Sequence, residues 1–123
     1  MFVVDDEQVI AQTLATILQQ SGFAAKSFTN PADALSASRS EAPDLLLSDV
    51  VMPELSGVDL AISIKREHPE CKVLLFSGQA ETVDLLSNAR EKGYDFHLLA
   101  KPLHPGELLR RIREQDPAWA LGA

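Results

Sequence analysis

Short apolar runs alternate with segments of helical periodicity along the whole chain of 123 residues. Between the runs, apolar residues recur every three or four positions, as Ile10, Leu14 and Ile17 do. The runs occupy residues 1–4, 23–28, 45–48, 73–76 and 97–100. Five strand–helix units in succession predict an α/β fold: a doubly wound, five-stranded parallel sheet in the order 2-1-3-4-5, with five flanking helices.

Residues that favour helix ends mark the boundaries of these units. Ser21-Gly22 is expected to end the first helix, and Asn30-Pro31 supplies an N-cap and a first-turn proline for the second. Gly93 is expected to cap the C-terminus of the fourth helix, and His104-Pro105 opens the last one. These signals therefore mark where two of the helices end and where two others begin.

Composition favours a single-domain, soluble protein of the cytoplasm. With 46% hydrophobic residues, one core is expected over residues 1–114, followed by a C-terminal tail or linker remnant at 115–123. A formal net charge of -7 disfavours direct binding to the phosphates of a nucleic acid. A single cysteine, Cys71, excludes an internal disulfide, and the sequence shows no signal peptide or apolar stretch for a membrane.

Chemically active side chains follow four of the five apolar runs. Asp5 and Asp6 follow the first run, Asp49 the third, Ser77 the fourth and Lys101 the fifth. Because the carboxyl ends of parallel strands meet, these residues are expected to share one crevice. Three carboxylates repel one another, and such oxygen-only ligands suit Mg²⁺, with Mn²⁺ as a substitute. Asp49 could then attack a phosphoryl group whose charge is met by the metal, Lys101 and Ser77.

Each of these residues also has an ordinary structural interpretation when taken alone. Asp5-Asp6 before a helix could serve only as N-terminal capping, and an isolated lysine such as Lys101 is most often a surface charge. The three histidines show no metal-ligand spacing: His68, His97 and His104. The combination of residues, rather than any one of them, therefore indicates a function.

Four motifs together resemble the receiver domain of two-component response regulators. They are VVDDE at 3–7, SDVVMPELSG at 48–57, FSGQA at 76–80 and AKP at 100–102. Any one motif is weak evidence, whereas their order and their positions at the ends of successive strands are specific. The resemblance covers nearly the whole chain, and it implies a flavodoxin-like fold and a role in phosphorelay signal transduction.

The resemblance implies a role for each site residue. Asp49 would accept a phosphoryl group from a phosphohistidine on a sensor histidine kinase or a histidine phosphotransfer protein. The implied ligands of Mg²⁺ are Asp5, Asp6, Asp49 and the backbone carbonyl of Val51, and the phosphoryl oxygens would contact Ser77 and Lys101. The chain would thus be a phosphoacceptor with weak self-dephosphorylation rather than an enzyme. Apolar Val51, two residues after the acceptor, cannot bond an attacking water and predicts a long-lived phosphoryl group.

Two contact surfaces are also implied by the resemblance. The start of the first helix, near Glu7, Gln8 and Ala11, would dock the phosphodonor. The face formed by the fourth helix, the fifth strand and the fifth helix would meet an output partner of unknown identity, or a second copy in a homodimer. The chain is expected to be either a stand-alone receiver or part of a longer protein.

One position departs from the family pattern. The residue three before Lys101 is commonly a switch Tyr or Phe, but here it is Leu98, with His97 as the neighbouring candidate. The segment before the lysine is one residue longer than the common spacing. Tyr94 or Phe96 could therefore serve only if a bulge absorbed the extra residue.

Two functions of other classes stay open. A phosphohydrolase with an aspartyl-phosphate intermediate normally carries an acid two residues after its nucleophile, where this chain has Val51. A degenerate receiver, acting as a phosphorylation-independent binding module, would lack an acid, the hydroxyl or the lysine, and this chain has all of them. Phosphoryl transfer to the chain itself is therefore the favoured function.

Overall fold

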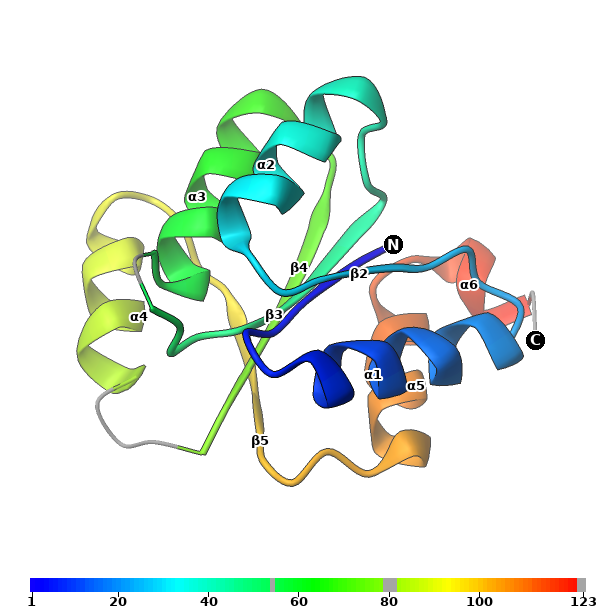
Figure 1. Ribbon diagram of the computed structural model, residues 1–123. Coiled ribbons are helices and arrows are strands. Elements are labelled where there is room, and N and C mark those ends of the chain that lie inside the picture. Colours follow the sequence, from blue (N-terminus) through cyan, green and yellow to red (C-terminus); the bar gives the residue numbers. More distant parts are fainter. Residues whose placement is uncertain (54, 79–81, 122–123) are drawn as a thin grey trace.

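Strands and helices alternate along the chain and build one sheet with its covering helices (Figure 1). The computed structural model describes residues 1–53, 55–78 and 82–121. The strands are β1 (Phe2–Val4), β2 (Lys26–Phe28), β3 (Leu45–Asp49), β4 (Lys72–Ser77) and β5 (His97–Ala100). The helices are α1 (Gln8–Gln20), α2 (Pro31–Ser40), α3 (Gly57–Glu67), α4 (Thr82–Glu91), α5 (Pro105–Glu114) and α6 (Pro117–Leu121).

All neighbouring strands run parallel, in the order β2-β1-β3-β4-β5. The central strand β3 pairs with β1 through Leu46 opposite Phe2, and with β4 through Leu47 opposite Leu74. The predicted α/β fold and strand order are therefore confirmed. Residues that follow the strands leave the sheet at one end, which we call the carboxyl end; the strands begin at the opposite, amino end.

Each face of the sheet is covered by helices over its own apolar cluster (Figure 1). On one face α1 and α5 pack over a cluster that includes Leu47 and Ile112. On the other face α2, α3 and α4 cover a cluster that includes Leu46 and Ile64. Successive side chains of a strand point to opposite faces, so Leu46 and Leu47 enter different clusters. Every residue of β3 is buried as a result.

Helix ends follow the signals in the sequence. Asn30 caps α2 by accepting a hydrogen bond from the backbone N–H two residues on, at 2.8 Å. Gly22 and Gly93, which follow α1 and α4, have φ angles of 94° and 92°, where glycine is least strained. β2 is shorter than predicted because the Phe23 N–H bonds the Leu18 carbonyl at 3.0 Å and so belongs to the end of α1.

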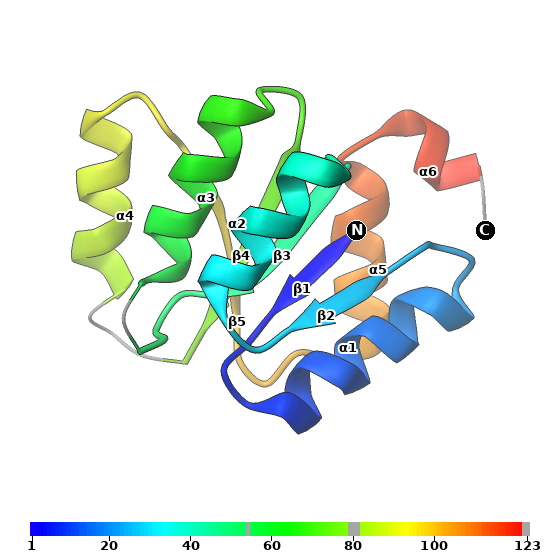
Figure 2. The ribbon, with the colours of Figure 1, turned by 45° about the horizontal axis from the view of Figure 1, so that its top comes forward.

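A sixth helix, α6, follows the five that the sequence predicts. It lies beyond α5, on the side of the molecule where the N-terminus lies (Figure 2). Trp119 of α6 packs edge-on against Phe23, with the ring centroids 6.2 Å apart. Five residues are too few to show a helical period, so the sequence pattern does not predict this element. Within the described residues, no helix is long and apolar enough to cross a bilayer.

Candidate functional site

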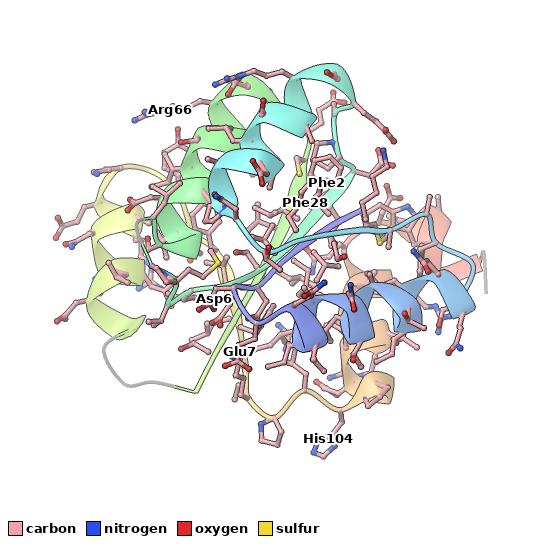
Figure 3. All side chains as sticks on the ribbon, viewed as in Figure 1. Phe2, Asp6, Glu7, Phe28, Arg66 and His104 are labelled. Carbon is pink, nitrogen blue, oxygen red and sulfur yellow. The ribbon has the colours of Figure 1, made fainter. Side chains whose placement is uncertain are left out.

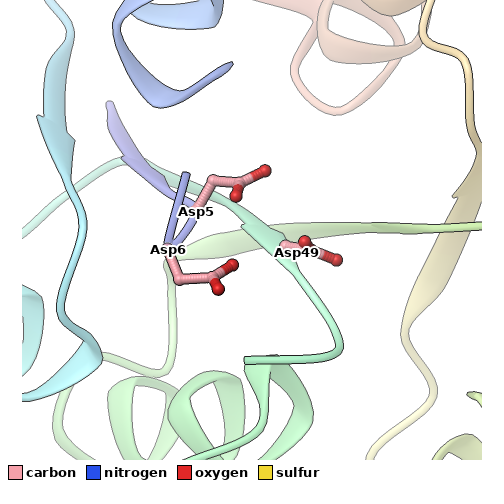
Figure 4. Close-up of side chains that lie close together, drawn as sticks. All are labelled: Asp5, Asp6 and Asp49. Carbon is pink, nitrogen blue, oxygen red and sulfur yellow. The ribbon is translucent and has the colours of Figure 1, made fainter. Parts of the chain in front are cut away.

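Three carboxylates gather at the carboxyl end of the sheet. Asp5 and Asp6 follow β1, and Asp49 is the last residue of β3. One carboxylate oxygen of each lies within 4.8 Å of the others (Figure 4). Asp5 and Asp49 are buried, whereas Asp6 is exposed beside Glu7, before the start of α1 (Figure 3). The fold thus brings together the three side chains that the sequence predicts as metal ligands.

An ammonium from the end of β5 enters the same cluster. Lys101 Nζ donates a hydrogen bond to Asp49 Oδ2 at 3.1 Å and lies 4.0 Å from Asp5 Oδ2. The Lys101 backbone N–H bonds the Ser77 carbonyl at 3.2 Å, so the pairing of β4 with β5 determines where the lysine emerges. The peptide bond between Lys101 and Pro102 is cis. The Lys101 ammonium therefore pairs with the two buried carboxylates of the cluster.

Asp5 has the least favourable surroundings of the three carboxylates. Its Oδ1 accepts a hydrogen bond from the Glu7 N–H at 2.9 Å, but its buried Oδ2 has no hydrogen-bond partner among the described residues. Burial raises the pKa of Asp5 from 3.8 to about 6; the charge of Asp49 adds to the rise, and the Glu7 N–H and Lys101 oppose it. A divalent cation beside these oxygens would offset both burial and repulsion. The cluster therefore fits a hard, oxygen-liganded ion.

An open hollow of about 610 Å³ lies over the carboxylates. Its lining includes Asp6, Asp49, Val51, Ser77 and Lys101. Ser77 is buried at the end of β4, and the Val51 side chain is partly exposed at the hollow. A group that enters the hollow therefore meets the predicted acceptor, hydroxyl and ammonium together. Three residues of the predicted motifs lie outside the described residues: Glu54, Gln79 and Ala80.

The loop from β3 to α3 is held close to Asp49 by a glycine. The Gly57 N–H donates to the Val50 carbonyl at 2.8 Å. A Cβ at position 57 would lie 2.0 Å from the Asp49 carbonyl oxygen, far inside any real contact. The Ser48 hydroxyl donates a hydrogen bond to the same carbonyl at 2.9 Å. Without movement of the backbone, only glycine permits this approach.

Comparison with known proteins identifies the family. The family model for the response regulator receiver domain matches residues 1–113. The chain belongs to the response regulator receiver family. It is 36% identical over 113 residues to the transcriptional regulatory protein CreB of Escherichia coli (strain K12), covering 92% of this chain and 48% of CreB. A CheY-like receiver domain protein from Methanospirillum hungatei JF-1 has the same fold, with a TM-score of 0.83 at 22% identity, covering 99% of this chain and 96% of that one.

The curated relatives are longer than this receiver. The DNA-binding transcriptional regulator NtrC of Proteus hauseri is 34% identical over 112 residues, which are 91% of this chain and 23% of NtrC. The receiver likewise spans about half of CreB, 48% of its length. The expectation of no nucleic-acid partner rests on the charge of the receiver alone. That expectation is not supported, because the relatives include a longer regulator named as DNA-binding.

The position three residues before Lys101 belongs to Leu98. β5 pairs with β4 in consecutive register along its whole length, so no bulge interrupts this strand. Leu98 is half-buried against the cluster beneath α2, α3 and α4, and His97 is exposed. Tyr94 and Phe96 stack on each other before the strand begins, with ring centroids 5.9 Å apart. An aliphatic side chain therefore stands where the resemblance places a switch Tyr or Phe.

A second, apolar hollow of about 590 Å³, the α1 groove, lies between α1 and the segment after β5. Its lining is Val9, Ile10, Thr13, Leu14, Ile17, Phe76, Lys101, Pro102, Leu103 and Pro105. Val9, which does not belong to the helical repeat of Ile10, Leu14 and Ile17, is 76% exposed. Ala11, expected at the docking surface, is instead fully buried, while Glu7 and Gln8 are exposed. The surface predicted for the phosphodonor is therefore wrong at Ala11.

Proposed function

We propose that this receiver accepts a phosphoryl group on Asp49, in a Mg²⁺-dependent reaction. The donor would be a phosphohistidine of a sensor histidine kinase or a histidine phosphotransfer protein. One observation carries the proposal: the buried Asp49 carboxylate bonds the Lys101 ammonium at 3.1 Å and shares a cluster with Asp5 and Asp6. Membership of the receiver family supports it.

The residues that would hold Mg²⁺ are Asp5, Asp6, Asp49 and the backbone carbonyl of Val51. Mg²⁺ prefers oxygen ligands and would supply positive charge to the phosphoryl oxygens. Asp5 Oδ2, buried and without a hydrogen-bond partner among the described residues, is an atom that a cation would satisfy. Val51 lines the same hollow as Asp49, which suits a ligand from its backbone.

Phosphoryl transfer would use Asp49 as the nucleophile. A bond forms between an Asp49 carboxylate oxygen and phosphorus, and the P–N bond of the donor breaks, its electron pair returning to the imidazole. Lys101 already neutralises one Asp49 oxygen and would pair with the charge added by the phosphoryl group. The Ser77 hydroxyl would donate a hydrogen bond to a phosphoryl oxygen. Since Asp49 is only 6% exposed, the donor must approach it through the hollow.

The phosphodonor would dock on the α1 groove. Lys101 lines both the groove and the hollow over the carboxylates, so a partner seated in the groove reaches Asp49. The exposed Val9 suits a partner helix with apolar side chains beside its phosphohistidine. The face of α4, β5 and α5 would meet the output partner or a second copy of the chain. The proposal includes a cytoplasmic location, where soluble phosphodonors and output partners can reach it.

Intact mass measured after incubation with Mg²⁺ and acetyl phosphate tests the proposal. We expect one stable phosphate adduct, and none when EDTA removes the metal. Continuous release of inorganic phosphate without an accumulating adduct would indicate a phosphohydrolase. An unchanged mass and an unconsumed phosphodonor would indicate a degenerate receiver that binds partners without phosphorylation.

A further inference from the structure

Phe76 lies under the ammonium that enters the phosphorylation site. Lys101 Nζ is 5.3 Å from the centroid of the Phe76 ring, within the distance of about 6 Å at which cations are attracted to ring faces. Phe76 is fully buried in β4, one residue before Ser77. The same ammonium donates its hydrogen bond to Asp49 at 3.1 Å. It therefore contacts a ring face and the acceptor carboxylate at the same time.

Lys101 needs such a surface because its side chain is long and partly exposed. Its side chain is 32% exposed, and a flexible, strongly hydrated ammonium loses conformational entropy when it is held in one place. A Cβ at Gly78 would lie 3.5 Å from Lys101 Cβ and 4.0 Å from Cδ, so the stem passes beside this residue in ordinary contact. The ring of Phe76 attracts the ammonium without adding a further negative charge to the site.

We propose that Phe76 is a positioning residue for phosphorylation, whose ring face holds the Lys101 ammonium beside Asp49. The inference rests on the proposed function, since it concerns the same reaction. Phe76 does not reach the reacting atoms and acts through Lys101. The ring also lines the α1 groove, so a donor seated there would contact the residue that orients the lysine.

Three substitutions separate the ring from the volume that it fills. Phe76→Leu removes the ring and keeps an apolar side chain, whereas Phe76→Tyr keeps the ring. Leu74→Val is the matched control, because Leu74 is buried in the same cluster two residues earlier in β4. Should Phe76→Leu not fold, Phe76→Met supplies the same loss of the ring.

Phosphorylation by acetyl phosphate at saturating Mg²⁺ is the first measurement, because this small donor does not depend on docking in the α1 groove. We expect Phe76→Leu to react about 3- to 10-fold more slowly, which is about 0.7 to 1.4 kcal/mol. Phe76→Tyr and Leu74→Val should stay within about twofold of the wild type. An equal loss in Leu74→Val would mean that core packing, not the ring, sets the rate.

A double-mutant cycle with Lys101→Met tests whether Phe76 acts through the lysine. If it does, adding Phe76→Leu to Lys101→Met should slow the reaction no further. A Phe76→Leu effect of full size in the Lys101→Met background would overturn the positioning role.

An NMR measurement that does not depend on phosphorylation tests this inference separately from the proposed function. The ε-methylene protons of Lys101 should show an upfield ring-current shift by NMR in the wild type and in Phe76→Tyr, but not in Phe76→Leu. Absence of this shift in the folded wild type would overturn the inference even if Asp49 is phosphorylated. The shift without any phosphorylation would uphold the contact but reject the phosphoacceptor function, and the positioning role with it.

Discussion

Charged side chains are buried and paired differently at the two ends of the sheet. At the amino end, the exposed Lys26 of β2 pairs with the exposed Glu41 at 2.7 Å. At the carboxyl end, three carboxylates lie together, and the Lys101 ammonium pairs with the two that are buried, Asp5 and Asp49. The same scaffold thus supports balanced surface pairs at one end and an unbalanced buried cluster at the other.

Stability alone does not account for the carboxyl end. Solvent-exposed pairs contribute little to stability, but they cost little as well. Burial raises the pKa of Asp5 to about 6, so keeping this carboxylate ionised at neutral pH costs free energy. The ionised Asp5 therefore opposes folding of the metal-free protein, and such a group in a hollow is typical of a functional site.

Substitution of Asp49, the proposed acceptor, should change phosphorylation more than any substitution at the amino end. We expect Asp49→Asn to abolish phosphorylation, because the amide oxygen is a poor nucleophile, while the fold survives because the side chain keeps its size. Intact mass after reaction with acetyl phosphate and thermal melting measure the two outcomes. Labelling of Asp49→Asn at the wild-type rate would place the acceptor elsewhere.

A methyl group at Gly57 should be the most destabilising change at the carboxyl end. Its Cβ would lie 2.0 Å from the Asp49 carbonyl oxygen, so we expect Gly57→Ala to lower the free energy of unfolding by about 3 kcal/mol or more. Gly78→Ala is the control, because its Cβ would lie 3.5 Å from Lys101 Cβ and needs no movement. Urea unfolding compares them, and equal losses would contradict the close approach.

Neutralising Asp5 should stabilise the metal-free protein, and only above acidic pH. The pKa of this acid is about 6 in the folded chain against 3.8 in the reference state, so the folded chain binds the proton more tightly. Below about pH 4 the acid is protonated in both the folded and the unfolded chain, so it does not lower the free energy of unfolding. Its ionisation lowers this free energy progressively between about pH 4 and 6, and the loss is complete above about pH 6.

We expect Asp5→Asn to gain about 1 to 3 kcal/mol at pH 7.5 in EDTA and nothing at pH 3.5, measured by urea unfolding. Asn keeps an oxygen that can accept the Glu7 N–H, so the variant tests charge rather than lost bonding. Equal free energies of unfolding of Asp5→Asn and the wild type at pH 7.5 would show that the buried charge does not destabilise the fold.

The residue two after the acceptor should control the lifetime of the phosphoryl group. Val51 is 38% exposed and lines the hollow, where an apolar side chain cannot orient an attacking water. We expect Val51→Asn to speed the loss of phosphate by about threefold to thirtyfold, or about 0.7 to 2 kcal/mol in barrier height. Decay after removal of the phosphodonor measures it, and equal or slower loss would assign the control to another residue.

The smallest effect should come from the amino end. Lys26→Met breaks the exposed pair with Glu41, and we expect no measurable change in the urea midpoint and none in phosphorylation rate. A clear loss of stability at 0.15 M salt would mean that the amino end depends on its ion pairs, and the contrast between the two ends would fail.

Features that follow from hydrophobic periodicity, and from where the strands end, could be predicted from the sequence. The apolar run that ends at Asp49 becomes a fully buried central strand, because a parallel sheet covers both of its faces. Asp5, Asp49 and Lys101 meet because their strands end together, and residues distant in sequence become neighbours for that reason alone. The roles assigned to Ser77 and Val51 stay predictions.

Features that depend on the direction of single side chains could not be predicted. Asp5 and Asp6 are adjacent, yet one is buried and the other exposed, and no periodicity distinguishes them at the end of a strand. The contact of Phe76 with Lys101 depends on the register of β4 and β5, two separate strands. Such properties arise only once the elements have packed.

The complete burial of β3 has a mechanical consequence. Its side chains are packed on both faces, and protein interiors have low compressibility, so the strand gives Asp49 a rigid base. When charge is added to the Asp49 carboxylate, the packed strand resists displacement toward the amino end. We therefore expect the displacement it causes at Ser77, the last residue of β4, and at Lys101, which follows β5, because both border the hollow.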